Sequence, residues 1–300
     1  MIYLGIYTGH NASAALMSNG KIIFALQEER FTNQKNFYGY PGQSIKHCLE
    51  YVKSKNLIID IAAFATINNP LFFSKYRFNN YFSISDFDKF YSISLDKNKA
   101  VSFVKNHKKT KKNMGLYLPF DKIKKKDYFN VKLARKILET QLKKQAKQKV
   151  KKIIFLDHHT CHAYYSYFSS KIRKDKSCIV SIDAFGDEAN QTVWIVDKNK
   201  LSLVAKTDQF EIARIYRFIT LILKMKPEEH EFKVMGLSAY SKEKFILDVY
   251  KKVFKNIQKF DGIKIVHHKR PRDLYKFLKE ATQNIRFDNI AGGLQYFVEK

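Results

Sequence analysis

Two segments of the chain, residues 2–26 and 178–207, share one order of elements: a strand, a small-residue turn, a second strand, another turn and a third strand. The four turns are Gly9-His10-Asn11, Ser18-Asn19-Gly20-Lys21, Gly186-Asp187 and Asp197-Lys198-Asn199. Asn-Gly favours the primed turns of β-hairpins, and small-residue turns can place backbone amides against a phosphate. The repeat therefore predicts two related lobes, each with one hairpin that faces a nucleotide.

Such a duplication favours the α/β class, and within it the two-lobed actin-like (ASKHA) ATPase fold with mixed sheets. The first lobe is expected at about residues 1–70 and the second at 151–300. Between them, residues 70–150 form an insertion rich in Phe, Tyr, Asn and Lys, with a helix near 131–148. Its clusters Lys108–Lys112 and Lys124–Lys126 indicate solvated faces or loops, and contact with a partner is the alternative. Further helices are expected from Pro41 to Lys53 and at three apolar stripes that begin at Ile212, Phe245 and Phe287.

A histidine pair follows the apolar strand Ile153–Leu156 in the sequence DHHTCHA. On a helix, His158 and His162 stand one turn apart on the same face, and two imidazoles so placed can hold one transition-metal ion. Asp183, at the end of the next strand, would add a carboxylate. A His-x-x-x-His pair without a metal is also common. His159 is expected to be a packing residue, and Cys161 a small buried residue rather than a ligand.

The composition is that of a folded protein, with 45% apolar residues and a formal net charge of +27. Of the 55 basic residues only 9 are arginine, the residue that leads in phosphate and base recognition. Nucleic acid is therefore an unfavoured partner. Three widely spaced cysteines (Cys48, Cys161 and Cys178), no basic leader and no long apolar run indicate a cytoplasmic protein without a membrane partner.

Five blocks together resemble the N-terminal part of NodU/CmcH-type O-carbamoyltransferases, a domain similar to TsaD. They are GHNASAAL (Gly9–Leu16), EERFTNQKN (Glu28–Asn36), DHHTCHA (Asp157–Ala163), DAFGDE (Asp183–Glu188) and PEEHEFKVMGLSAY (Pro227–Tyr240). They stand in the same order as in that family and extend over nearly the whole chain. A TsaD-like role in tRNA modification is an alternative that the first and last blocks disfavour.

The resemblance implies a function and a site. Such enzymes form carbamoyl-adenylate from carbamoyl phosphate and ATP in a YrdC-like C-terminal domain, and the N-terminal domain passes the carbamoyl group to a hydroxyl of a saccharide or natural product. It implies His158, His162 and Asp183 as ligands of a divalent metal, expected to be Fe²⁺ with Zn²⁺ or Mn²⁺ as alternatives, and His10 as the catalytic residue. Expected at the nucleotide and carbamoyl side are Gly9, Asn11, Gly186 and Asp187. Expected at the substrate or nucleotide side are Glu29, Lys35, Glu229, Glu231 and Lys233.

The sequence also departs from the family pattern. Asn11 replaces an acid, and Glu211-Ile212-Ala213-Arg214-Ile215-Tyr216 replaces Ser-x-Gly-x-x-Tyr. The glycine-rich nucleotide segment, a further metal-binding aspartate and the YrdC-like domain would follow Lys300. A truncated second lobe is therefore expected. A separate C-terminal half chain would be a partner, or the chain would be a non-catalytic homologue that binds a nucleotide or another polypeptide.

Overall fold

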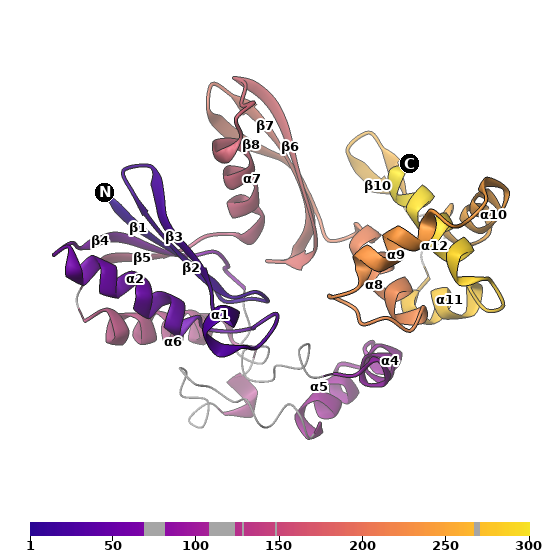
Figure 1. Cartoon of the computed structure of the whole chain (residues 1–300), viewed down its shortest axis with the longest axis horizontal. Helices are drawn as coiled ribbons and strands as arrows, with labels where there is room; N and C mark the ends of the chain where they lie inside the picture. The colour runs from indigo at the N-terminus through magenta and orange to yellow at the C-terminus, as the bar shows by residue number, and fades with distance from the viewer. Residues whose placement is uncertain (69–81, 108–123, 128, 148, 267–270) are drawn as a thin grey trace. The chain divides into compact units, whose positions relative to one another are not determined.

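The computed structural model describes the chain except for residues 69–81, 108–123, 128, 148 and 267–270 (Figure 1). It divides into two compact units. The first comprises Met1–Tyr81 with Val104–Tyr165, and the second comprises Phe82–Phe103 with Ser166–Lys300. No helix of the described residues is long and apolar enough to cross a membrane.

The first unit contains a five-stranded sheet in the order β3-β2-β1-β4-β5. Its strands are β1 (Ile2–Tyr7), β2 (Ser13–Ser18), β3 (Lys21–Gln27), β4 (Ile59–Phe64) and β5 (Val150–Phe155). β1 is antiparallel to β2 and parallel to β4, and β5 is parallel to β4. The predicted hairpins are thus confirmed. Asn19 and Gly20 both have positive φ, as a primed turn requires.

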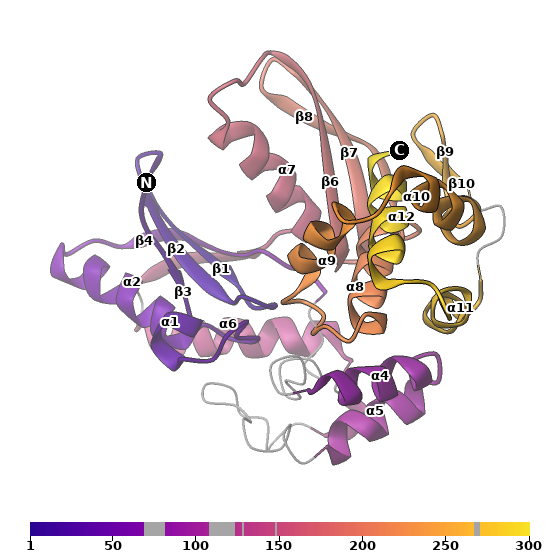
Figure 2. The same ribbon diagram turned by 45° about the vertical axis from the view of Figure 1, so that its right-hand side comes forward.

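Two long helices cover one face of this sheet, α2 (Gly42–Ser54) and α6 (Val131–Ala146) (Figures 1 and 2). Alternate residues of β1 point to this face, so Leu4 and Ile6 are buried in one cluster with Val52 and Leu138. Both helices agree with the predicted ranges to within two residues. A short helix, α1 (Glu29–Thr32), follows β3. The 3₁₀ turn Lys125–Asp127 precedes α6.

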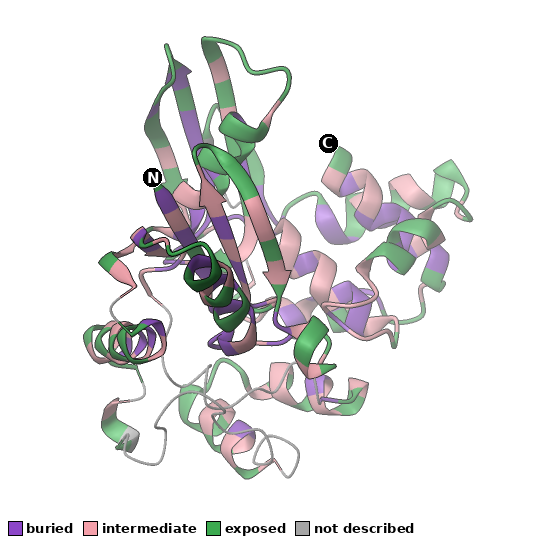
Figure 3. Cartoon of the chain, turned by 60° about the vertical axis from the view of Figure 1, so that its left-hand side comes forward, coloured by how far each residue is buried: buried purple, intermediate pink, exposed green. Residues whose placement is uncertain are grey.

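The second unit contains a three-stranded antiparallel sheet in the order β6-β7-β8. Its strands are β6 (Lys176–Gly186), β7 (Ala189–Asp197) and β8 (Lys200–Thr207), which confirms the second predicted hairpin set. Among the described strands, β6 has a neighbour on one side only. Val180 and Ile182 of β6 are 50% and 53% exposed, whereas Leu4 and Ile6 of β1 are 0% and 1% exposed. Exposed bands accordingly run along the strands of this sheet (Figure 3).

A helical part completes the second unit. Its elements are α8 (Ile212–Ile222), α9 (Glu231–Ser238), α10 (Glu243–Val249), a π-helical turn (Tyr250–Phe254), the strands β9 (Lys259–Asp261) and β10 (Lys264–Val266), α11 (Leu274–Ala281) and α12 (Phe287–Glu299). Apolar residues of α8, α9 and α12, among them Ile219, Val234 and Leu294, share one buried core. The three predicted apolar stripes coincide with α8, α10 and α12.

The insertion contains two helices that sequence periodicity did not predict, α4 (Ile84–Ile93) and α5 (Lys97–Asn106). α4 packs with the second unit: Tyr275 and Lys279 of α11 donate hydrogen bonds to Asp88 Oδ1 at 2.5 and 2.7 Å. The expected lobe division near residue 150 also differs from the observed one, because β5 pairs with β4 of the first sheet. Lys124 and Lys126 are exposed as predicted, and Lys108–Lys112 lie outside the described residues.

Candidate functional site

The histidine motif follows β5 and forms α7 (His158–Ser169), the helix on which the metal hypothesis depends. The Asp157 carboxylate accepts hydrogen bonds from the backbone N–H and the hydroxyl of Thr160, at 2.8 and 3.0 Å. This is the bonding of an N-cap residue, which satisfies amides that the first helical turn leaves without partners. The Asp-His-His-Thr sequence therefore fixes where α7 begins and which face each histidine occupies.

His158 and His162 bring their Nε2 atoms to 3.0 Å from each other, and their ring planes are nearly perpendicular. Two nitrogens that each lie about 2.1 Å from one ion at a right angle are about 3 Å apart. The donor set therefore fits a shared transition-metal ion, and without an ion the same spacing fits a hydrogen bond between neutral rings. His158 is buried and His162 is exposed, so the pair is open on one side.

His159 and Cys161 lie on the same helix, α7, as the histidine pair. His159 is fully buried, and its ring centroid lies 5.6 Å from that of His158. Cys161 is partly buried, and its backbone N–H continues the helix by donating to the Asp157 carbonyl.

The turn that carries His10 is held by backbone bonds to the segment after α1. The N–H of Ala12 donates to the Phe37 carbonyl, and the N–H of Gly39 donates to the Thr8 carbonyl. Asn11 adopts φ 57°, a left-handed conformation that asparagine tolerates well. Gly9 is buried and His10 is exposed, so the imidazole is accessible on a fixed turn.

Tyr7, at the end of β1, contacts both His10 and His158. Its hydroxyl lies 3.4 Å from His10 Nδ1, and its ring centroid lies 5.5 Å from that of His158. Sequence reasoning missed this residue. The available signal was strand alternation, which places Tyr7 on the opposite face of β1 from the buried Ile6.

Asp183, Gly186 and Asp187 lie in the second unit, at the end of β6. The Asp183 Oδ1 accepts a hydrogen bond from the N–H of Ala184 at 2.6 Å. Asp187 and Glu188 both have positive φ between the paired residues Gly186 and Ala189, which makes a tight primed turn. That Asp183 is a third metal ligand stays a prediction. That the Gly186-Asp187 turn binds a nucleotide stays a prediction as well.

The EERFTNQKN block contributes local structure. Glu28 is fully buried and accepts three hydrogen bonds from Gln43 and Ser44 at the start of α2. The Glu29 carboxylate accepts a hydrogen bond from the N–H of Asn36 at 2.9 Å, and Lys35 is exposed. The predicted substrate-side role of Glu29 and Lys35 is an expectation that these contacts leave open.

The PEEHEF block forms a charged turn before α9. Glu229 pairs with Lys226, Glu228 pairs with Arg217 at 3.4 Å, and Glu231 accepts a hydrogen bond from the N–H of Glu228. The three carboxylates of this block therefore stabilise the turn through ion pairs and a hydrogen bond. Lys233 is exposed, with its ammonium 5.9 Å from the centre of the Phe232 ring. Substrate contacts by Glu229, Glu231 and Lys233 stay predictions.

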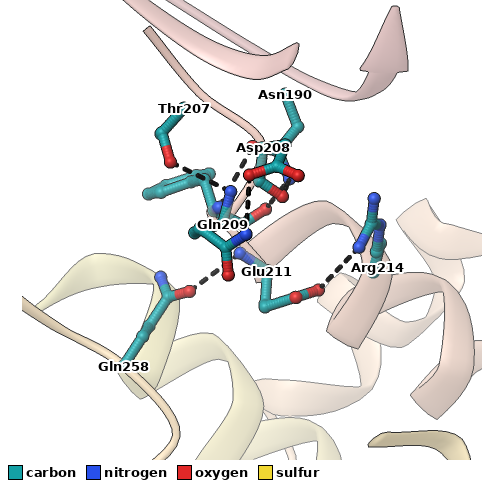
Figure 4. Close-up of polar contacts among 8 residues, drawn as sticks. Asn190, Thr207, Asp208, Gln209, Glu211, Arg214 and Gln258 are labelled. Carbon is teal, nitrogen blue, oxygen red and sulfur yellow. Dashed lines mark hydrogen bonds and ion pairs between the residues drawn. The ribbon is translucent and has the colours of Figure 1, made fainter. Parts of the chain in front are cut away.

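The segment that departs from the family pattern lies at the start of α8 (Figure 4). The Glu211 N–H donates to Gln258 Oε1 at 2.8 Å, and Arg214 pairs with the buried Glu211 carboxylate at 3.4 Å (Figure 4). Asn190 of β7 is bonded to the backbone of Phe210 in both directions, which joins the sheet to this helix start. Beside it, Glu211, Arg214, Phe218 and Tyr275 line a cavity of about 360 Å³.

Comparison with known proteins agrees with the five sequence blocks. Residues 2–300 match the family described as Carbamoyltransferase N-terminus, and the chain belongs to this family. It is 26% identical to the uncharacterized protein MJ1051 of Methanocaldococcus jannaschii, an alignment that covers 95% of this chain and 42% of that protein. It is 24% identical to the nodulation protein NolNO of Sinorhizobium fredii, with 77% of this chain and 28% of that protein aligned. The chain thus spans less than half the length of these curated relatives.

Proposed function

We propose that the chain is the metal-binding, carbamoyl-transferring part of an ATP- and metal-dependent O-carbamoyltransferase with the actin-like fold. The acceptor is a hydroxyl of a saccharide or natural product, and the donor is carbamoyl-adenylate made from carbamoyl phosphate and ATP. The observation that carries the proposal is the convergence of the His158 and His162 Nε2 atoms at 3.0 Å, in a chain of the carbamoyltransferase N-terminal family.

At the carbamoyl carbon, the proposed reaction forms one C–O bond and breaks another. The acceptor oxygen attacks the carbamoyl carbon, the bond from that carbon to the adenylate phosphate oxygen breaks, and AMP leaves with the electron pair. A neutral His10 imidazole takes the proton of the attacking hydroxyl. His10 suits this role because it is exposed on a turn that backbone bonds hold in place.

His158, His162 and Asp183 would hold the divalent ion. When bound, the ion supplies Lewis-acid polarisation of the carbamoyl oxygen and charge neutralisation at the leaving phosphate. Two imidazoles and a carboxylate form a donor set that suits Fe²⁺ and accepts Zn²⁺ or Mn²⁺. The amides of the Gly9-His10-Asn11 and Gly186-Asp187 turns would face the nucleotide phosphates.

Metal content decides the proposal. The purified chain, loaded anaerobically with Fe²⁺ and desalted, is expected to retain about one ion, measured by elemental analysis. His162→Ala should lose it, whereas His47→Ala, a change of an exposed histidine on α2, should not. Retention of the ion by His162→Ala, or no retention by the wild-type chain, would contradict the site. Turnover is then tested with carbamoyl phosphate, ATP and a complementing C-terminal half.

A second candidate function is that of a homologue that binds a nucleotide or a partner chain without catalysis. The exposed Val180 and Ile182 on a strand with one described neighbour favour this alternative. A metal-bearing chain that shows no turnover with any complementing half, yet copurifies with that half, would support it over the transferase.

A further inference from the structure

Tyr7 contacts both His10, on the turn after β1, and His158, at the start of α7. We propose that Tyr7 is a positioning residue of this site: its hydroxyl fixes the His10 imidazole, and its ring supports His158. The inference rests on the proposed function, because it assigns Tyr7 a task in the same reaction. The supporting contacts are the 3.4 Å approach to His10 Nδ1 and the tilted ring contact with His158, whose centroids lie 5.5 Å apart.

The backbone explains why the Tyr7 side chain takes this position. Strand alternation directs Ile6 into the core and Tyr7 to the other face of β1. Gly9 then leaves space for the ring, since a Cβ at that position would overlap the Tyr7 hydroxyl and ring carbons. A larger residue at position 9 would therefore displace the Tyr7 ring from its place beside His10 and His158.

The contact also selects which nitrogen of His10 meets the substrate. Imidazole has two nitrogens, and a partner at one of them fixes the proton arrangement and the orientation of the ring. When the Nδ1–H of His10 donates to the Tyr7 hydroxyl oxygen, Nε2 carries the lone pair that accepts the proton of the attacking hydroxyl. The ring contact acts separately, because it restricts the rotation of a predicted metal ligand. Groups that orient metal ligands change metal affinity about 10- to 100-fold when removed.

Two substitutions separate these tasks. Tyr7→Phe removes the hydroxyl and keeps the ring, whereas Tyr7→Leu removes both. Tyr3→Phe is the matched control, because Tyr3 lies on the same face of β1 and its hydroxyl donates to Met1 Sδ. Circular dichroism of each variant verifies that the chain is folded.

The hydroxyl is tested on the metal-free chain. With ¹⁵N-labelled histidine, and the His10 signals assigned by their loss in His10→Gln, Tyr7→Phe should shift both His10 ring nitrogens while Tyr3→Phe leaves them in place. The ring is tested by competition titration with Co²⁺: Tyr7→Leu should bind it about tenfold more weakly, and Tyr7→Phe within about twofold of wild type. Where the wild-type protein shows carbamoyl transfer, Tyr7→Phe should lower kcat about tenfold and leave the KM for the acceptor unchanged.

The outcomes of the two proposals are distinguishable. Unchanged His10 nitrogen signals in Tyr7→Phe, or unchanged Co²⁺ affinity in Tyr7→Leu, overturn the inference about Tyr7 while the metal site stands. A wild-type chain that binds neither Fe²⁺ nor Co²⁺ refutes the proposed function itself.

Discussion

The Glu28 carboxylate accepts hydrogen bonds from both the backbone N–H and the hydroxyl of Ser44, sixteen residues further along the chain, at 2.8 and 2.9 Å. A third bond comes from the N–H of Gln43 at 3.0 Å. Glu28 thus performs from a distance the task of an N-cap, since it satisfies amides of the first turn of α2 and places a negative charge at the positive end of the helix.

Glu28→Gln should lower the free energy of unfolding by about 1–3 kcal/mol, because a neutral amide replaces a buried charge that accepts three bonds. Urea denaturation measures the loss. Glu50→Gln, an exposed change on the same helix, should alter stability by no more than about 0.5 kcal/mol. Equal effects of the two substitutions would show that Glu28 does not cap α2.

Two glycines at helical positions should respond to alanine in opposite directions. A Cβ on Gly293 of α12 would lie 2.6 Å from a Val249 methyl carbon of α10, whereas a Cβ on Gly236 of α9 would meet nothing within 4 Å. Gly293→Ala should therefore cost about 1–2 kcal/mol through overpacking, even after the gain in helix propensity. Gly236→Ala should add up to about 1 kcal/mol. Melting temperatures that move in the same direction would contradict this packing.

Docking of α4 onto α11 should weaken in acid. Burial alone would raise the pKa of Asp88, but hydrogen bonds from Lys279 and Tyr275 outweigh it and lower the pKa. A carboxyl with a lowered folded-state pKa stabilises the fold above its unfolded pKa and loses that contribution as the pH falls through the folded value. We expect the stability difference between wild type and Asp88→Asn, about 1 kcal/mol at pH 6, to shrink below about pH 4.

Alkaline pH should leave the same contact intact. Burial, followed by the bond to Asp88, raises the pKa of Tyr275, so the phenol remains a donor.

The acid sensitivity of the docking between α4 and α11 can be measured by hydrogen exchange of the α4 amides. Protection that falls equally in wild type and Asp88→Asn below pH 4 would assign the acid sensitivity to another group.

The cysteines should differ in reactivity toward a thiol reagent at pH 8. Burial raises the pKa of the Cys48 thiol to about 11, so almost none of it is thiolate, and its side chain is fully buried. Cys178 on β6 is exposed. We expect Cys178 to react fast in the native chain and Cys48 only after unfolding, with Cys178→Ser removing the fast phase. A fast phase that persists in Cys178→Ser would contradict this order.

Local patterns were sufficient to predict both hairpin sets and most helices. Asn19-Gly20 between two apolar strands favours a primed turn, and the apolar spacing of α8 and α12 defines one buried face on each helix. The histidine pair was also predictable, because Asp157 and Thr160 form a local cap that fixes the start of α7.

Features that depend on distant contacts were not predictable. Of the α4 residues only Phe87 is buried, and Phe82, which precedes the helix, packs edge-on against both Phe87 and Phe103. A local signal of this helix is the capping box of Ser83 and Asp86. The contact between Tyr7 and His158 depends on how β1 and β5 are arranged in the first sheet. The spacing of residues along the chain does not predict the distance between these two side chains.

The open side of β6 has a consequence for the chain in solution. A strand with exposed Val180 and Ile182 and one described neighbour can template the strand of another copy. The net charge of +27 opposes that encounter while ionic strength is low. Near physiological salt the Debye length falls to about 8 Å, and charge repulsion over longer distances is largely screened. We therefore expect self-association through β6 to increase with salt concentration.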